Sequence, residues 1–235
     1  MTPLLAAQLA VVVFWSAIHL GAGRLRFLDH VPRSAYLSVA GGVSVAYVFL
    51  HILPELRAAA HTHHWPHPVA IEALALSGLI VFYGLERMVT RRQTHERAAF
   101  WLHLASFAVY GVLIGLFLAR EPHEDWVDVL LAGFALGLHL LANDYGLAKR
   151  HGDWYAQRGR YVLAACPPLG WALGRFLEIP AQPLDGGFAF LAGGIVLNTL
   201  KEELPEERES RFSAFLVGAL AYGGALLLLA RDLVL

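Results

Sequence analysis

Ionisable and amide side chains recur within the long apolar stretches of this sequence. An ionisable group in hydrocarbon is costly, so it usually faces the interior of a helix bundle or a water-filled path. Imidazole nitrogens and carboxylate oxygens also suit zinc and several other divalent metals as ligands. The candidate metal ligands are His51, Glu55, His103, His139, Asn143, Asp144, Asn198 and Glu202.

The spacing of these residues suits helices. His51 with Glu55, and His139 with Asn143, lie four residues apart, which places each pair on one helix face a turn apart. At a rise of about 1.5 Å per residue, His139 lies near the middle of its stretch and the others lie nearer to helix ends. The candidates therefore form a ladder through the membrane, which suits a permeating cation.

These polar residues also have explanations that involve no metal path. Glu55 and Glu202 could simply meet water at helix ends, and His103 could bond a backbone carbonyl. Asp144 could pair with a Lys or Arg near the inner surface. His139 is the hardest to dismiss because it lies in mid-helix, although its imidazole could bond a neighbouring helix.

Composition points to a bilayer as the solvent. Hydrophobic residues make up 57% of the 235 residues and charged residues 16%, and the mean hydropathy is +0.52. Soluble domains usually carry about 25% charged residues. The net charge of -1 gives no basic surface for nucleic acid. Because Cys166 is the one cysteine, a single chain can form neither an internal disulfide nor a thiolate metal cage.

Eight stretches are long and apolar enough to span a bilayer, which needs about 20 residues each. Their connections are short, so we expect an all-α protein with one transmembrane domain over residues 1–235. The predicted spans are roughly 3–22, 35–56, 69–89, 99–118, 127–148, 157–176, 184–203 and 212–232.

The distribution of charge predicts the orientation. Most of the 18 Lys and Arg residues fall in every second connection, beginning with the one after the first span. Positive charge stays cytoplasmic, so both termini should be extracytoplasmic, and we expect a bacterial cytoplasmic (inner) membrane. The expected partners are the lipid bilayer and a divalent metal ion, and a homodimer is one assembly compatible with the sequence.

Two segments of opposite topology are alike. Residues 42–55 and 193–206 both begin with Gly and end in Leu-Pro-Glu at a fixed offset. Inverted repeats are typical of secondary transporters, whose substrate site lies near the midplane between the repeats. The alternative is a chance match between two apolar helices that end where Pro and Glu are common.

Three segments resemble the ZIP (Zrt/Irt-like) divalent-metal transporters. GGVSVAYVFLHILPEL resembles the second helix of that family, GLIVFYGLERMV the third and AGGIVLNTLKEELPE the seventh. The resemblance implies eight helices in a 3+2+3 arrangement, with helices 1–3 and 6–8 inverted around helices 4 and 5. It also implies transport of zinc or a similar divalent cation.

The family's metal motifs are degenerate here. In the fourth helix, Ser106, Phe107 and Tyr110 stand where the family has its ligands. In the fifth helix His139 is kept, but Leu140 replaces an acidic ligand. Because Phe and Leu side chains cannot coordinate a metal, a binuclear site of the family type is excluded.

The sequence therefore predicts a carrier of a divalent cation through a reduced, non-binuclear site, with no tightly bound cofactor. His139 and Asp144 would be the primary ligands, assisted by Asn143, Asn198 and Glu202, with His103 near them. The alternative is a ZIP-like protein without metal transport, acting as a sensor or scaffold or carrying a different substrate. The sequence holds no HExxH, GxSxG or Walker-type motif, so we expect neither an enzyme nor an ATPase.

Two further features could modify this fold. A histidine tract after the second span could gather metal loosely or form a solvated turn; it comprises His61, His63, His64 and His67. Pro167 and Pro168 should kink or break the sixth span.

Overall fold

A computed structural model describes residues 2–25, 35–67, 69–91, 96–120, 125–203 and 211–232, and regular structure there is entirely helical. Within these ranges, the description excludes the side chains of residues 89–91, 199–200, 202–203 and 229–232. The all-α prediction is confirmed for the described residues.

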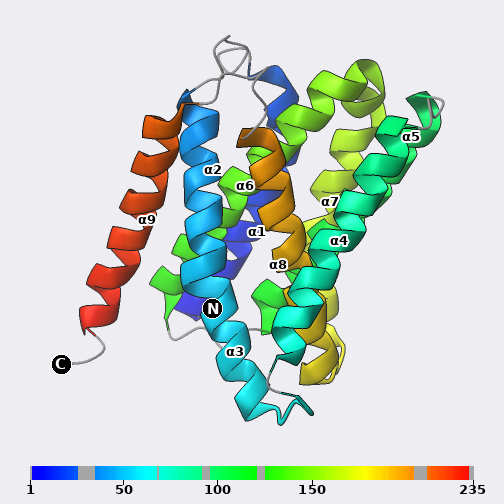
Figure 1. Ribbon diagram of the computed structural model, residues 1–235. Helices are drawn as coiled ribbons and strands as arrows, with labels where there is room; N and C mark the ends of the chain where they lie inside the picture. The colour runs from blue at the N-terminus through cyan, green and yellow to red at the C-terminus, as the bar shows by residue number, and fades with distance from the viewer. Residues whose placement is uncertain are drawn as a thin grey trace.

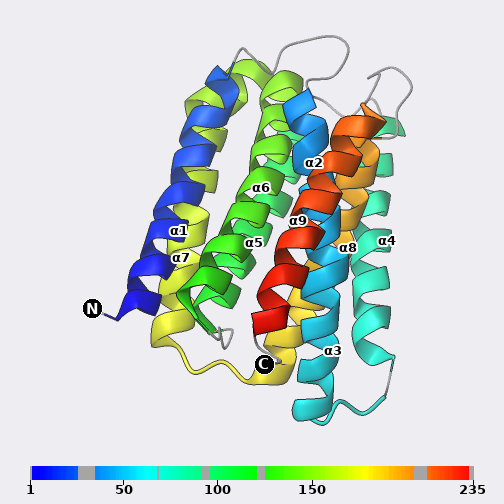
Figure 2. The ribbon, with the colours of Figure 1, turned by 90° about the vertical axis from the view of Figure 1, so that its left-hand side faces the viewer.

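The helices form one bundle of long, mostly antiparallel elements (Figure 1). They are α1 (Pro3–Gly21), α2 (Ala35–Tyr47), α3 (Leu53–Thr62), α4 (Ala70–Arg91), α5 (Glu96–Arg120), α6 (Trp126–Trp154), α7 (Arg160–Phe176), α8 (Ala181–Glu203) and α9 (Phe212–Asp232). The π-helical segments Val48–Ile52 and Tyr155–Gly159 join α2 to α3 and α6 to α7. The start of α1 and the end of α9 lie toward the same end of the bundle (Figure 2).

Four helical stretches among the described residues are long and apolar enough to cross a membrane. They are Pro3–Arg24, Ala35–Thr62, Glu96–Arg120 and Trp126–Phe176, and Phe212–Leu228 is a shorter apolar helix. α4 and α8 are less apolar, with Glu86 on the first and Asp185 and Lys201 on the second. The helices are compatible with a multi-pass membrane protein.

The stretch Trp126–Phe176 reverses direction near Gly152. This residue has φ 42° and ψ -112°, a left-handed conformation that glycine adopts without steric cost. The sequence predicted that the fifth span ends at residue 148, but α6 continues as a helix up to Gly152, where it kinks, and helical structure resumes to Trp154. Residues 149–151 therefore lie on a helix and not in a loop.

Of the kink or break predicted at Pro167 and Pro168, the break is not found, because α7 is continuous from Arg160 to Phe176. Pro168 has no N–H to donate to the Ala164 carbonyl one turn earlier. The Ser16 hydroxyl donates to that carbonyl instead, at 2.9 Å. A side chain on α1 thus replaces the lost backbone bond.

Glycine lets the backbones of α2 and α9 touch. A Cβ atom added at Gly42 would overlap the Phe215 carbonyl oxygen, and one at Gly218 would overlap the Val39 carbonyl oxygen. Small residues allow this approach in membrane bundles, where packing rather than hydrophobic burial holds helices together.

The crossing of α8 with α4 repeats this geometry. A Cβ at Gly193 would overlap the Ala75 carbonyl oxygen, and one at Gly78 would overlap that of Phe190. Phe190 precedes Gly193 by the same three residues that separate Val39 from Gly42 in α2. The aligned glycines of the two similar segments thus occupy equivalent places in two separate crossings, and α2 and α8 run in opposite directions (Figure 1).

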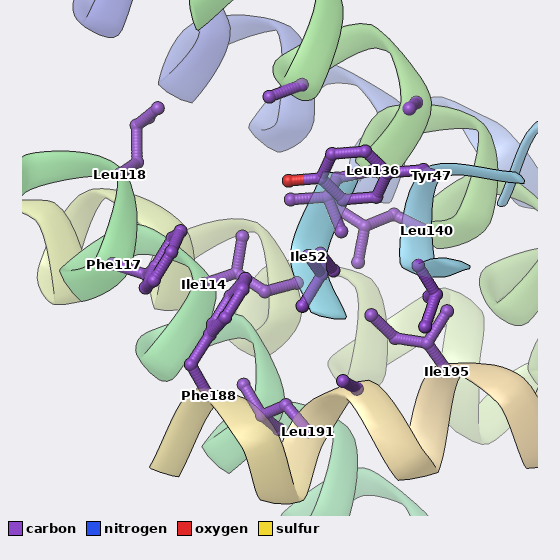
Figure 3. Close-up of a cluster of buried hydrophobic side chains, with 14 of the residues drawn as sticks. Tyr47, Ile52, Ile114, Phe117, Leu118, Leu136, Leu140, Phe188, Leu191 and Ile195 are labelled. Atoms are coloured by element: carbon purple, nitrogen blue, oxygen red, sulfur yellow. The ribbon is translucent and has the colours of Figure 1, made fainter. Parts of the chain in front are cut away.

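An apolar core fills the centre of the bundle (Figure 3). It includes Tyr47, Ile52, Ile114, Phe117, Leu136, Leu140, Phe188, Leu191 and Ile195. Along α6, Leu140 precedes Asn143, and along α8, Ile195 precedes Asn198. The core therefore lies between His51 and the two asparagines, and it interrupts the predicted polar ladder.

We expect Gly42→Ala and Gly193→Ala each to lower the stability of the protein in detergent by about 1–3 kcal/mol, the usual cost of overpacking. Thermal unfolding followed by circular dichroism measures this loss. Gly84→Ala is the matched control, since nothing lies within 4 Å of a Cβ added there. Equal stability of all three variants would contradict the close-packed crossings.

Candidate functional site

A pocket of about 50 Å³ opens between α4, α5, α6 and α8, near the ends where α4, α6 and α8 finish. At about 10–15 Å³ per water-sized sphere, it has room for a few water molecules. Its described lining is Phe82, Leu85, Glu86, His103, Ser106, Phe107, Asn143, Gly146, Leu147, Arg150, Asn198 and Lys201. Each of the four helices contributes one ionisable side chain to it: Glu86, His103, Arg150 and Lys201.

Glu86 of α4 is the centre of an ionic cluster in this pocket. Its Oε1 accepts from Arg150 Nη1 at 3.0 Å, and its Oε2 lies 3.1 Å from Lys201 Nζ. The His103 Nε2 atom lies 3.4 Å from the same Oε2. Glu86 is 21% exposed, and a partly buried carboxylate is stabilised by such compensation, because a charge removed from water without a partner is destabilising.

His103 also contacts His151, which lies one residue beyond Arg150 on α6. The His103 Nδ1 and His151 Nε2 atoms are 3.0 Å apart. One nitrogen must donate and the other accept, so at least one of the two rings is neutral. The two imidazoles therefore add at most one positive charge to the cluster.

His139 and Asn143 form a hydrogen-bonded pair beside the pocket. Asn143 Nδ2 donates to His139 Nε2 at 2.9 Å, so this nitrogen has no proton of its own. His139 is 2% exposed and its ring lies 5.6 Å from that of Tyr110. Asn143 lines the pocket whereas His139 lies behind it.

Asp144 belongs to a different cluster. Five residues separate it from His139, which turns it about 140° around the helix. His19 Nδ1 lies 2.7 Å from Asp144 Oδ2, and the Tyr155 hydroxyl donates to the same oxygen at 2.8 Å. This buried group joins α1, α6 and the segment Tyr155–Gly159.

His51 and Glu55 lie at the opposite end of the core from the pocket. His51 Nε2 is 3.1 Å from Glu55 Oε1, and the His51 ring stacks on that of Tyr47. His51 belongs to the π-helical segment that precedes Pro54. His51, together with Tyr47, lines a smaller and mostly apolar cavity that is separate from the polar pocket.

The histidine tract packs on the start of α8. His63 Nδ1 lies 2.7 Å from Asp185 Oδ2, and Trp65 Nε1 donates to the same oxygen at 3.3 Å. Gln182 Nε2 also donates to the His63 carbonyl at 2.8 Å. At least one histidine of the tract is thus fixed by α8, which favours a structural role for the turn.

The structure brings together only some of the predicted ligands. Asn143, Asn198 and His103 line one pocket, and His139 reaches it through Asn143. The Glu202 side chain lies outside the described residues. Among the residues that are described, no group of three or more His, Cys, Asp or Glu side chains is placed to hold a metal ion. Metal binding by these residues stays a prediction.

Sequence reasoning missed four members of the cluster. Glu86 lies inside the apolar run GLIVFYGLERMV, and a carboxylate within an apolar run could have identified it as a candidate site residue. Arg150 counted as cytoplasmic charge and as a possible partner of Asp144, Lys201 counted only as cytoplasmic charge, and His151 gave no signal in the sequence. Their convergence depends on the continuation of α6 beyond residue 148.

Comparison with known proteins adds no relative. No family model matches the chain, and no curated protein matches it. The ZIP resemblance therefore remains a prediction based on three helical segments, and function has to be argued from the site.

We expect Tyr155→Phe to destabilise the protein by about 1–3 kcal/mol, because it leaves Asp144 with one hydrogen bond fewer in a buried position. Chemical unfolding in detergent micelles measures the change. Tyr83→Phe serves as the control, since Tyr83 is 51% exposed. If both variants unfold alike, the Asp144 cluster contributes no stability.

Proposed function

We propose that this protein is a membrane carrier with eight spans in a ZIP-like 3+2+3 arrangement and both termini outside the cytoplasm, in a bacterial inner membrane. Four helical stretches are apolar and long enough to span, and the remaining long helices are packed in the same bundle. The excess of Lys and Arg in alternate connections supports the orientation.

The duplicated glycine crossing is the observation that carries this proposal. In this repeat α1 corresponds to α7, α2 to α8, α4 to α9 and α5 to α6. The α2–α9 contact then corresponds to the α8–α4 contact. In the same way, the α5–α7 contact corresponds to the α6–α1 contact. Such equivalence supports an inverted repeat of helices on either side of a central pair, which is an architecture of secondary transporters.

The polar pocket is the proposed inner part of the substrate path. Its walls come from α4 of one repeat, α8 of the other, and the central α5 and α6. Substrate sites of carriers with inverted repeats lie at this kind of junction. The apolar core around Leu140 and Ile195 closes the path on the other side, which supports an inward-facing state.

The charges in the pocket bear on the choice of cargo. Two like unit charges about 4 Å apart repel by about 4 kcal/mol at an effective dielectric constant of about 20. A divalent cation would meet Arg150 and Lys201, whereas Glu86 is already held by both. The geometry therefore supports a polar or anionic substrate better than a bare divalent metal.

A divalent cation is the second candidate cargo. The His139–Asn143 pair and the proximity of His103 to Glu86 favour it, together with the three ZIP-like segments. Such a cation would pass through a reduced, non-binuclear site, and His139→Ala should then lower its flux.

Flux into proteoliposomes tests the carrier proposal. We expect saturable uptake of a small polar or anionic solute, and we expect Asn198→Leu to reduce it at least about tenfold by removing a polar group from the pocket. Ser213→Leu, at an exposed position on α9, should leave uptake unchanged. Zinc, cadmium, manganese and iron are assayed in parallel.

The failure of this test would be informative. Uptake restricted to metals, and lost in His139→Ala, would favour the second candidate. No uptake of any solute by folded wild-type protein would refute the carrier proposal and favour a membrane sensor or scaffold.

A further inference from the structure

We propose that Arg97 and Arg158, which both lie over the Trp154 ring, bind the head group of an anionic phospholipid such as phosphatidylglycerol. The site lies at the end of the bundle where α6 finishes and the chain turns into α7. The inference is independent of the cargo, because lipid binding is measured without transport.

Two cations gathered on one aromatic ring are the first support. The Arg97 Cζ atom lies 5.7 Å from the centroid of the Trp154 ring, and the Arg158 Cζ atom lies 5.6 Å from it. Each guanidinium is attracted to the ring, whereas the two like charges repel each other. An anionic group bound to both guanidiniums would replace this repulsion by attraction, so the arrangement favours an anionic ligand.

The ring on which the arginines meet is held in place from below. Phe100 is fully buried, and its ring centroid lies 5.9 Å from that of Trp154 and 5.3 Å from that of Trp101. Arg97 comes from the first turn of α5, and Arg158 comes from the π-helical segment Tyr155–Gly159. Three segments of the chain thus assemble the site before any ligand binds, which lowers the ordering cost of binding.

The two arginines are accessible. Arg97 and Arg158 are both exposed, and so are the acidic residues beside the site in the sequence, Glu96 and Asp153. Within the described part of the chain, neither arginine forms an ion pair with these carboxylates. The guanidiniums can therefore be reached by a ligand from the surrounding bilayer.

An exposed stripe on α5 favours a lipid over a free anion. It begins at Arg97 and continues through Trp101, Ala105 and Val109, which are all exposed and are spaced four residues apart, on one helix face. The rise from Arg97 to Val109 is about 18 Å, close to half of the roughly 30 Å hydrocarbon core. A head group on Arg97 would therefore lay its acyl chain along this stripe through one leaflet.

α7 repeats this pattern after Arg158. Val162, Ala165 and Leu169 follow it and are exposed, and α7 packs along α5, with both helices beginning at this end of the bundle. Trp and Tyr side chains are enriched at the membrane interface, and basic sites at the cytoplasmic ends of spanning helices bind anionic head groups. A cation followed by an apolar face complements a phospholipid, whereas free phosphate would use the cation alone.

Native mass spectrometry of the full-length protein in detergent tests this inference, with dioleoyl phosphatidylglycerol as the probe. Dioleoyl phosphatidylcholine has the same acyl chains without net charge, and sodium phosphate supplies the free anion. We expect the wild type to bind phosphatidylglycerol at least about tenfold more tightly than phosphatidylcholine. Arg97→Gln and Arg158→Gln should each reduce this preference about fivefold, the usual effect of one basic residue at an anionic membrane surface.

Arg87→Gln is the matched control, because it makes the same charge change at an exposed position of α4, near the end of that helix. This variant should keep the preference of the wild type. Monodisperse elution and unchanged thermal unfolding establish that each variant is folded. The variants at Arg97 and Arg158 lie on separate segments, so the test stays decisive if one of them does not fold.

Four results would overturn the inference. They are equal binding of the two lipids by the wild type, an unchanged preference in the double variant Arg97→Gln/Arg158→Gln, and an equal loss of preference in Arg87→Gln. The fourth is displacement of phosphatidylglycerol by sodium phosphate but not by sodium chloride at equal ionic strength, which would indicate a site for free anions. Lipid binding without any flux would refute the carrier proposal alone.

Discussion

Backbone contact at glycine is the constraint on which the rest of this structure depends. Gly42 and Gly193 bring the main chains of two helix pairs together at distances that a single added Cβ would prevent. Gly115 in α5 makes a third contact of this kind with the Pro167 carbonyl of α7. Because lipid gives no hydrophobic drive for helix association, these close approaches fix where each helix lies. The position of the polar pocket follows from them.

The pocket then combines burial with charge in a way that restricts its chemistry. Glu86 lies between two cations and a histidine, so it is satisfied without a metal ion. These ion pairs are partly exposed, so the loss of one cation would leave Glu86 less well compensated but still in reach of water. Any ligand of the pocket must therefore replace or extend this network.

The sequence was sufficient for the helices but not for the site. Long apolar runs predicted helical segments close to those observed, and the match between residues 42–55 and 193–206 indicated equivalent places for Gly42 and Gly193. Asp144 was assigned together with His139, although a spacing of five residues turns it away on a helix. The ionic cluster was missed because Glu86, Arg150 and Lys201 are far apart in sequence and meet only through tertiary packing. Because a loop was expected after residue 148, Arg150 was not treated as a helical residue.

The orientation of the bundle is the central claim that one measurement tests most directly. Single cysteines are introduced into a Cys166→Ala background and labelled with a membrane-impermeant maleimide in intact cells. Thr62→Cys and Glu178→Cys should react from outside, whereas Arg158→Cys and Arg211→Cys should react only after permeabilisation, and all four positions are exposed. Labelling of Arg158→Cys or Arg211→Cys in intact cells, or protection of Thr62→Cys or Glu178→Cys there, would contradict the proposed eight-span carrier with its polar pocket toward the cytoplasm.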